Sequence, residues 1–119
     1  MKKFLASFGY AIAGIIFHLE YGLNFKIHLF FACSALALCL FLHVALWEWI
    51  VVFALIGGVL ALESVNSAIE ILCNFITEEK HEQIKRVKDL CASGVLIFAC
   101  CSLIIGSIIF IPKVMTLVS

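Results

Sequence analysis

Two long stretches without charge constrain this chain more than any other feature. Residues 27–47 and residues 90–112 are runs of 21 and 23 residues that contain no Asp, Glu, Lys or Arg. About 20 apolar residues are enough for a helix to cross a hydrocarbon layer about 30 Å thick. Because that layer offers the backbone no hydrogen-bonding partner, segments of this length can cross it only as helices. The two runs therefore predict two transmembrane helices.

The segment between these runs is long but carries two acids. Residues 49–62 are uncharged and too few to cross alone, and the apolar pattern continues through Glu63 and Glu70 to residue 76. The whole stretch of 28 residues is long enough to cross with a turn or two emerging into water. We therefore expect a further span over 49–76 with both acids on it.

The first 25 residues are less clearly a membrane span. Apolar side chains recur there at helical spacing, but polar residues stand beside them: Lys2, Lys3, His18 and Glu20. This pattern is typical of an amphipathic helix that lies in the membrane interface. The expectation for 1–25 is such an interfacial helix, with a short fourth span as the alternative.

A short charged segment, residues 77–89, separates the second and third spans. Eight of its residues are charged, which is half of all the charged residues in the chain. We expect a wet loop there, helical in part. Lysine and arginine concentrate before the first span and in this loop, so the positive-inside rule places the N-terminus and the loop in the cytoplasm. The C-terminus would then lie outside.

Composition excludes several classes of protein. The chain is 65% hydrophobic and 13% charged, with a mean hydropathy of +1.20, which excludes an ordinary soluble globule. Basic and acidic residues balance at eight each, so no basic patch favours a nucleic-acid partner. The six cysteines lie in or beside apolar runs without C-x-x-C or zinc-type spacing, and are predicted to be packing residues. We expect one domain over 1–119 that completes its burial against other copies of itself.

Polar residues on the predicted second span recur at helical spacing. Glu63, Asn66, Glu70 and Asn74 follow i, i+3, i+7 and i+11, which places them on one face of a helix. A carboxylate at membrane depth costs on the order of 2.5–3.5 kcal/mol, so intramembrane acids usually have a function. A polar seam that only joins helices is the plainer interpretation.

The two acids lie about 10 Å apart along the helix axis. The shallower Glu70 could hold a cation with phosphates, and the deeper Glu63 could take a proton from a group buried in lipid. Basic residues that suit phosphates follow in the loop: Lys80, Lys85, Arg86 and Lys88. No Walker-type motif is present, so any nucleotide site must have another design.

The string E-S-V-N-S-A-I-E over 63–70, followed by His81 and then Lys88-Asp89, resembles the prokaryotic diacylglycerol kinase family. This family of small membrane lipid kinases includes undecaprenol kinases. The string N-F-K-I-H over 24–28 is similar to the N-F-R-I-H of Gram-positive-type members, which lean toward undecaprenol. The resemblance implies an all-α membrane protein of the bacterial inner membrane, with an interfacial helix, three transmembrane helices and a homotrimeric assembly with shared active sites.

The resemblance also implies roles for individual residues in ATP-dependent phosphorylation of a lipid alcohol, diacylglycerol or undecaprenol. Glu63 matches the general base, Asn66 a position that orients the lipid site, and Glu70 a ligand of the Mg²⁺ carried by ATP. Further positions match residues that contact the nucleotide: Lys3, Tyr10, Glu79, Lys80, His81, Lys88 and Asp89.

Three positions depart from the family pattern. Gly22 stands where the family has a second metal-binding Glu, Leu23 where it has an Arg, and Asn74 where it has an Asp. Glu20 lies about 200° round an ideal helix from position 22, so it could substitute only if the helix breaks at Gly22.

Two alternatives to a working kinase remain open. One is an impaired member with a structural or regulatory role, and the other is a small ion- or proton-conducting protein with Glu63 and Glu70 in its path. His28 and His43 are interpreted as interface or hydrogen-bonded residues rather than ligands.

Overall fold

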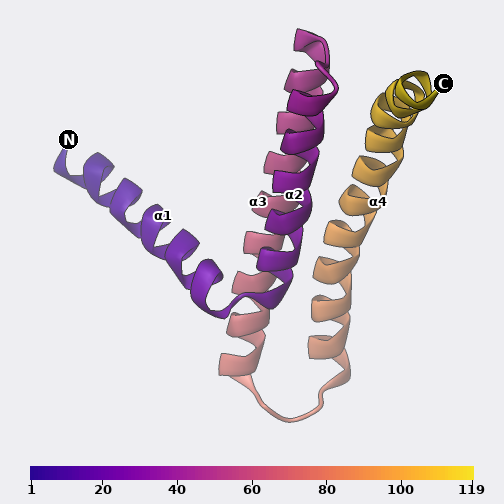
Figure 1. Ribbon diagram of the computed structural model, residues 1–119. Helices are drawn as coiled ribbons and strands as arrows, with labels where there is room; N and C mark the ends of the chain where they lie inside the picture. The colour runs from indigo at the N-terminus through magenta and orange to yellow at the C-terminus, as the bar shows by residue number, and fades with distance from the viewer.

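A computed structural model describes all 119 residues and is entirely helical. Its four helices, in chain order, are α1 (Lys2–Tyr21), α2 (Leu23–Phe41), α3 (Leu46–Ile76) and α4 (Glu82–Val118). Helices α2, α3 and α4 lie side by side in an elongated bundle, and α1 leaves it at a wide angle (Figure 1). Each of the four is long and apolar enough to cross a membrane. The expectation of an all-α membrane protein is confirmed, and α1 too has the length and composition of a span.

The helix ends differ from those expected from the charge pattern. Helix α2 covers Leu23–Phe41 rather than 27–47, and α3 begins at Leu46 rather than at residue 49. The largest difference is at the charged segment 77–89, where α4 begins at Glu82 and leaves only residues 77–81 as loop. The absence of charge marks the hydrocarbon layer, whereas a helix continues into water when its own side chains stabilise it.

The first turns of α4 have that stabilisation. The Lys85 ammonium lies 2.6 Å from the Asp89 carboxylate, and the Arg86 guanidinium lies 3.1 Å from that of Glu82. Both pairs are spaced i, i+4, which supports a helix in water. His81 caps the helix, since its Nδ1 accepts a hydrogen bond from the Gln83 backbone N–H at 3.1 Å. These contacts make most of the charged segment helical.

A sharp elbow at Gly22 separates α1 from α2. Gly22 is extended, with φ −92° and ψ 94°, and is both the last cap of α1 and the first cap of α2. A Cβ added there would lie 2.9 Å from the His18 carbonyl oxygen and 3.1 Å from His18 Nδ1. The His18 ring stacks on Phe25 at a centroid distance of 4.4 Å and is buried, although the sequence pattern groups His18 with the polar residues of the expected interfacial helix, whose polar side chains would face water. Packing against α2 outweighs its polarity.

The bundle has a closed end where α2 turns into α3, which we call the far end (residues 39–52 and 105–113). Its core is formed by Cys39, Val44, Val52 and Ile109. Glu48 is 5% exposed, and its Oε1 accepts a hydrogen bond from the Ala45 backbone N–H at 2.9 Å. The same oxygen lies 3.0 Å from Lys113 Nζ, which joins the start of α3 to the end of α4. The opposite end, residues 74–89, is called the loop end.

Helices α3 and α4 approach closely at Gly58. A Cβ at position 58 would clash with the ring of Phe98. The ring can pack here because glycine has no side chain. All six cysteines are free. Cys39 and Cys73 are packed inside as expected, whereas Cys33, Cys100 and Cys101 are exposed on the outer surface of the bundle.

Candidate functional site

The polar stripe on α3 runs from the bundle interior to the loop end. Because α3 is unbroken from Leu46 to Ile76, the helical spacing of Glu63, Asn66, Glu70 and Asn74 keeps them on one side. Exposure grows along the stripe: Glu63 is 3% exposed, Asn66 is half-buried, and Glu70 and Asn74 are exposed. The stripe therefore joins a desolvated carboxylate to a carboxylate that water and solutes can reach.

Glu63 has two polar neighbours. Its Oε1 accepts a hydrogen bond from the Ser67 hydroxyl, one turn along α3, at 3.5 Å. Its Oε2 lies 3.8 Å from Nε2 of His28 on α2. The interpretation of His28 from sequence missed this proximity to a candidate catalytic residue. A signal did exist, because a buried acid needs a polar partner and His28 is a titratable residue at the start of an otherwise uncharged run.

Lys88 is the loop-end residue that the structure brings to the stripe. Its Nζ donates a hydrogen bond to Oδ1 of Asn74 at 2.6 Å, across 14 residues of chain. Asn74 lies one helical turn from Glu70, so an ammonium group stands at the open end of the stripe. Because Asn74 is neutral, the positive charge of Lys88 is not cancelled by this partner.

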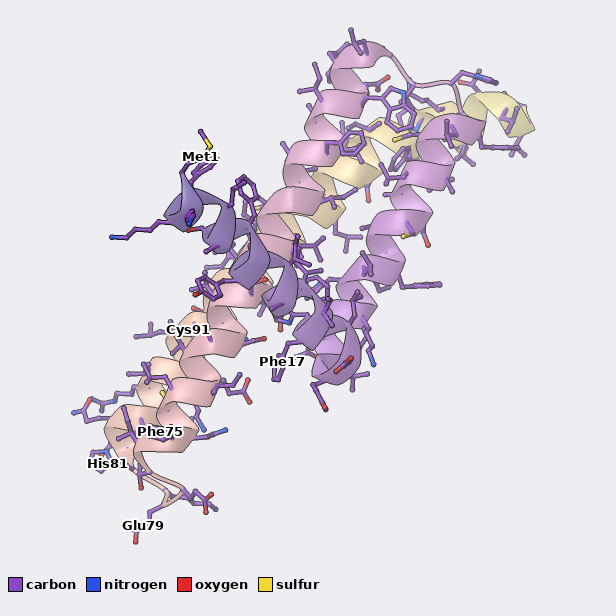
Figure 2. All side chains as sticks on the ribbon, turned by 90° about the vertical axis from the view of Figure 1, so that its left-hand side faces the viewer. Met1, Phe17, Phe75, Glu79, His81 and Cys91 are labelled. Atoms are coloured by element: carbon purple, nitrogen blue, oxygen red, sulfur yellow. The ribbon has the colours of Figure 1, made fainter.

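The other predicted nucleotide residues of this region lie at the tip of the bundle. Glu79 and Lys80 are exposed, and the Glu79 backbone N–H donates to the Thr77 hydroxyl at 3.0 Å, which shapes the loop. His81 caps α4 through Nδ1, and Asp89 pairs with Lys85. Figure 2 shows Glu79 and His81 at this tip, away from the start of α1. Their hydrogen bonds and ion pairs are made within the loop and the first turns of α4, and none is made to Glu63.

Lys3 and Tyr10 do not join the other predicted site residues within one chain. Both belong to the first half of α1, the helix that leaves the bundle (Figure 1), and Tyr10 is 78% exposed. The elbow at Gly22 sets this direction, and beside it His18 of α1 stacks on Phe25 of α2. A single copy of the chain therefore presents an incomplete set of predicted nucleotide residues.

The donor set fits Mg²⁺ that arrives on a nucleotide better than a resident ion. No group of three or more His, Cys, Asp or Glu residues lies close enough together to hold a metal. The helix does break at Gly22, but Glu20 lies before the break, inside α1 and exposed. Mg²⁺ commonly uses one or two carboxylates together with substrate phosphates and waters. Glu70, exposed at the open end of the stripe, suits that mode.

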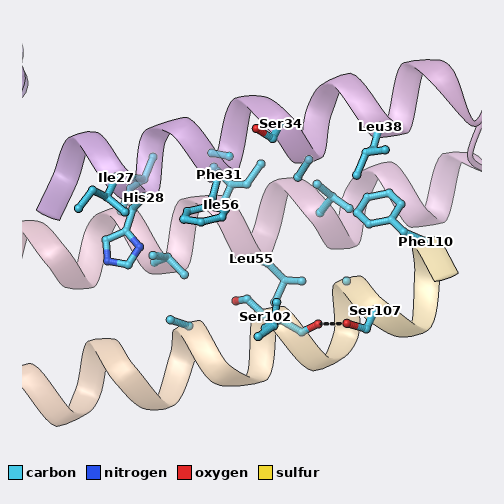
Figure 3. A pocket seen from close by; sticks show the side chains of 18 residues that line it. Ile27, His28, Phe31, Ser34, Leu38, Leu55, Ile56, Ser102, Ser107 and Phe110 are labelled. Carbon is cyan, nitrogen blue, oxygen red and sulfur yellow. Dashed lines mark hydrogen bonds between the residues drawn. The ribbon is translucent and has the colours of Figure 1, made fainter.

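A cavity of about 510 Å³ lies between α2, α3 and α4. Figure 3 shows it as an elongated space with His28 and Ile27 near one end and Phe110 at the other. Thirteen of its 18 lining residues are hydrophobic. Three serines line the cavity: Ser34, Ser102 and Ser107. Each hydroxyl donates its hydrogen bond to a backbone carbonyl of its own helix, so its proton is not available to a ligand. The cavity is therefore apolar except at the end that His28 borders.

Comparison with known proteins identifies the family to which the chain belongs. The family model described as prokaryotic diacylglycerol kinase matches residues 9–110, which include the stripe, the loop and most of every helix. The chain belongs to the prokaryotic diacylglycerol kinase family. It is thus a member of a family of membrane lipid kinases, for which ATP is the co-substrate, and the resemblance of the 63–70 motif is confirmed.

Three curated relatives support this membership. The chain is 38% identical over 113 residues to the undecaprenol kinase of Bacillus subtilis, covering 95% of this chain and 92% of that protein. It is 30% identical over 114 residues to a diacylglycerol kinase of Synechocystis sp., covering 95% of this chain and 65% of the relative. It is 31% identical over 102 residues to a diacylglycerol kinase of Haemophilus influenzae, covering 85% and 86%. No solved structure matches the chain.

Proposed function

We propose that this protein transfers the γ-phosphoryl group of ATP to a lipid alcohol in the membrane, diacylglycerol or undecaprenol. The observation that carries the proposal is the α3 stripe, which joins a buried carboxylate to an exposed one, in a chain of the prokaryotic diacylglycerol kinase family. A lipid hydroxyl approaches from the hydrocarbon side and ATP approaches from water. The stripe extends between those two environments.

Glu63 acts as the general base in this proposal. Its burial keeps the carboxylate away from water, and a positioned carboxylate can take a hydroxyl proton during attack. The hydroxyl oxygen attacks the γ-phosphorus in line with the departing ADP oxygen. Asn66, one turn toward the loop end, orients the lipid headgroup. Most of the acceleration comes from holding the reacting groups together and from neutralising charge.

The phosphate side of the site is assigned to Glu70 and the loop end. Glu70 would hold Mg²⁺, which supplies charge neutralisation on the phosphates of ATP when bound. Lys88 contributes an uncancelled positive charge beside the stripe, and Asp89 stands next to it. Nucleotide contacts are completed by Glu79, Lys80 and His81 from the loop.

We further propose a homotrimer with shared active sites, in which Lys3 and Tyr10 contribute to the nucleotide site of a neighbouring copy. Their position on the diverging part of α1 supports this, because a single chain leaves them exposed and apart from the stripe. The N-terminus and the loop would face the cytoplasm of a bacterium, where ATP is found, and α1 would lie in the interface. This orientation rests on the distribution of Lys and Arg.

Lipid phosphorylation by the purified protein tests the proposal. The protein in mixed micelles receives labelled ATP and Mg²⁺, with diacylglycerol and undecaprenol offered separately. We expect label in at least one lipid, lost in Glu63→Gln and kept in Glu82→Gln, a matched change at an exposed acid outside the stripe. Label in one lipid alone would also name the substrate.

Absence of label from a folded protein would favour an impaired family member, for which Gly22 and Asn74, which stand where the family pattern has acids, are the supporting positions. Binding of Mg-ATP without turnover would then be measured by calorimetry. Proton or ion flux into liposomes in the absence of ATP would instead favour a conducting protein.

A further inference from the structure

A buried general base must lose a proton after every turnover. Glu63 is 3% exposed, so once it has taken the hydroxyl proton it cannot hand that proton directly to bulk water. The next turnover needs the carboxylate to be ionised again. The two polar groups at its oxygens are the Ser67 hydroxyl at 3.5 Å and the His28 imidazole at 3.8 Å.

We propose that His28 is a positioning residue for Glu63 that also accepts its proton and passes it on to water. This inference rests on the proposed function, because it requires Glu63 to act as the base. Nε2 of His28 faces Oε2 of Glu63 at 3.8 Å, slightly beyond direct hydrogen-bond distance. Hydrogen bonds of a catalytic group are often long before substrate binds and shorten in the complex.

The chemistry of the two neighbours favours His28 over Ser67. A serine hydroxyl does not gain a proton near neutral pH, so Ser67 can hold a carboxylate in place but cannot store its proton. An imidazole ordinarily titrates near pH 6.5 and can do both. His28 is also more accessible than its partner, since its side chain is 24% exposed whereas that of Glu63 is 4% exposed.

Other charged groups do not compete for the His28 ring. Lys26 on α2 directs its ammonium to the Glu20 carbonyl at 3.4 Å, and His18 of α1 stacks on Phe25. Helix α4 presents no ionisable side chain to the cavity that His28 lines; its lining residues are Ala99, Ser102, Leu103, Gly106, Ser107 and Phe110. Glu63 of α3 is the acid that His28 faces.

Every proton in this proposal has a donor and an acceptor. The lipid O–H bond breaks and its proton goes to Glu63, while the oxygen forms a bond to the γ-phosphorus and the bond from that phosphorus to ADP breaks. The Glu63 carboxyl then gives the proton to Nε2 of neutral His28, which leaves a carboxylate and an imidazolium. The imidazolium releases a proton to water, and both groups return to their starting states. No oxidant or additional reactant is required.

Chemical rescue tests the proposal, because His28 borders a cavity of about 510 Å³ that can admit free imidazole. His28→Ala is assayed for lipid phosphorylation with and without imidazole over a range of pH. We expect kcat to fall about 100-fold with little change in KM for ATP, in keeping with the loss of one proton-transfer group. Added imidazole should restore kcat at least tenfold, and the restored rate should follow the neutral fraction of imidazole.

Two other variants make the outcome specific. His43→Ala is the matched control, since His43 follows the opposite end of α2 and is exposed; it should keep its activity and show no response to imidazole. His28→Gln keeps a polar side chain of similar size without the ability to take a proton, and it covers the case in which His28→Ala does not fold. We expect His28→Gln to be slowed about as much as His28→Ala.

Full activity of either His28 variant, or a loss in His28→Ala that imidazole does not relieve, would overturn the role of His28. The proposed kinase activity would still be supported, since Glu63→Gln would still be inactive. An active Glu63→Gln would instead overturn the proposed base, and with it the reason for a proton acceptor.

Discussion

The two ends of the bundle join α3 to α4 by the same kind of contact, a lysine of α4 against a polar side chain of α3. At the far end, Lys113 meets the Glu48 carboxylate at 3.0 Å, and the Glu48 side chain is only 6% exposed. At the loop end, Lys88 meets the Asn74 amide at 2.6 Å, where Asn74 is exposed. At the far end a partly exposed ammonium meets a buried carboxylate, whereas at the loop end an ammonium meets a neutral, exposed amide.

The difference separates a contact that serves stability from one that suits binding. The charges of Glu48 and Lys113 neutralise each other, and Glu48 also accepts a hydrogen bond from the Ala45 backbone N–H. Each group therefore has a partner within the protein. Asn74 fixes the Lys88 ammonium in position without cancelling its charge, which remains available to an anion such as phosphate. Substitutions at the two ends should therefore affect the use of ATP and the stability of the fold separately.

Removing the ammonium at the loop end should have the largest effect. We expect Lys88→Ala to lower kcat/KM for ATP about 100- to 1000-fold, the range found when one charge-stabilising group is lost from a phosphoryl or acyl transfer site. The melting temperature should change little, because Asn74 can bond to water instead. Steady-state kinetics with labelled ATP and a thermal melt in detergent measure the two effects. A stable, fully active variant would refute the phosphate role.

Removing Asn74, the partner that positions Lys88, should lower kcat/KM for ATP less than removing Lys88 itself. Asn74→Ala keeps the Lys88 charge but releases it from its 2.6 Å hydrogen bond, so the ammonium must be ordered when ATP binds. We expect kcat/KM for ATP to fall about tenfold, consistent with the cost of ordering one long side chain. Kinetics of Asn74→Ala, Lys88→Ala and the double variant measure the coupling. Additive losses would mean that the two residues act independently.

Breaking the Glu48–Lys113 pair at the far end should lower stability and leave activity unchanged. Lys113→Met removes the ammonium and leaves the Glu48 carboxylate buried without its counter-charge, which is costly in a protein interior. We expect the melting temperature to fall by several degrees while kcat per folded molecule stays the same. Lys113→Met with Glu48→Gln should recover part of the stability. A stable but inactive Lys113→Met would place a functional requirement at the far end.

Breaking an exposed charge pair at the loop end should have the smallest effect. Glu82→Gln removes the partner of Arg86, and both side chains are largely exposed, at 79% and 63%. Exposed i, i+4 pairs contribute about 0.3–0.5 kcal/mol to a helix at most. We expect no resolvable change in melting temperature or activity. A clear loss of activity would instead assign Arg86 or Glu82 to the nucleotide site.

The sequence predicted the helices and the stripe because both depend on local spacing. Charge-free runs of the right length indicated the spans, and the 63–74 pattern placed four polar residues on one side of α3 without knowledge of any neighbour. The helix ends were harder, since the cap at His81 and the side-chain pairs that follow it carry α4 beyond the hydrocarbon layer.

Sequence patterns did not predict which side chains make contact between helices. His28 lies 35 residues from Glu63, and no periodicity within α2 shows which side chain of α3 it faces. The burial of His18 likewise depends on the elbow that stacks it on Phe25. The direction of α1, and with it the separation of Tyr10 from the stripe, follows from backbone angles at one glycine.

The elbow at Gly22 also restricts which side chains position 22 can carry. A side chain at this position would meet the His18 carbonyl oxygen at 2.9 Å from its Cβ, so an acidic residue cannot simply return to the place where the family pattern has one. The backbone between α1 and α2 would have to open at the same time. The glycine and the bend therefore depend on each other, and an acidic side chain introduced at position 22 alone should destabilise the elbow.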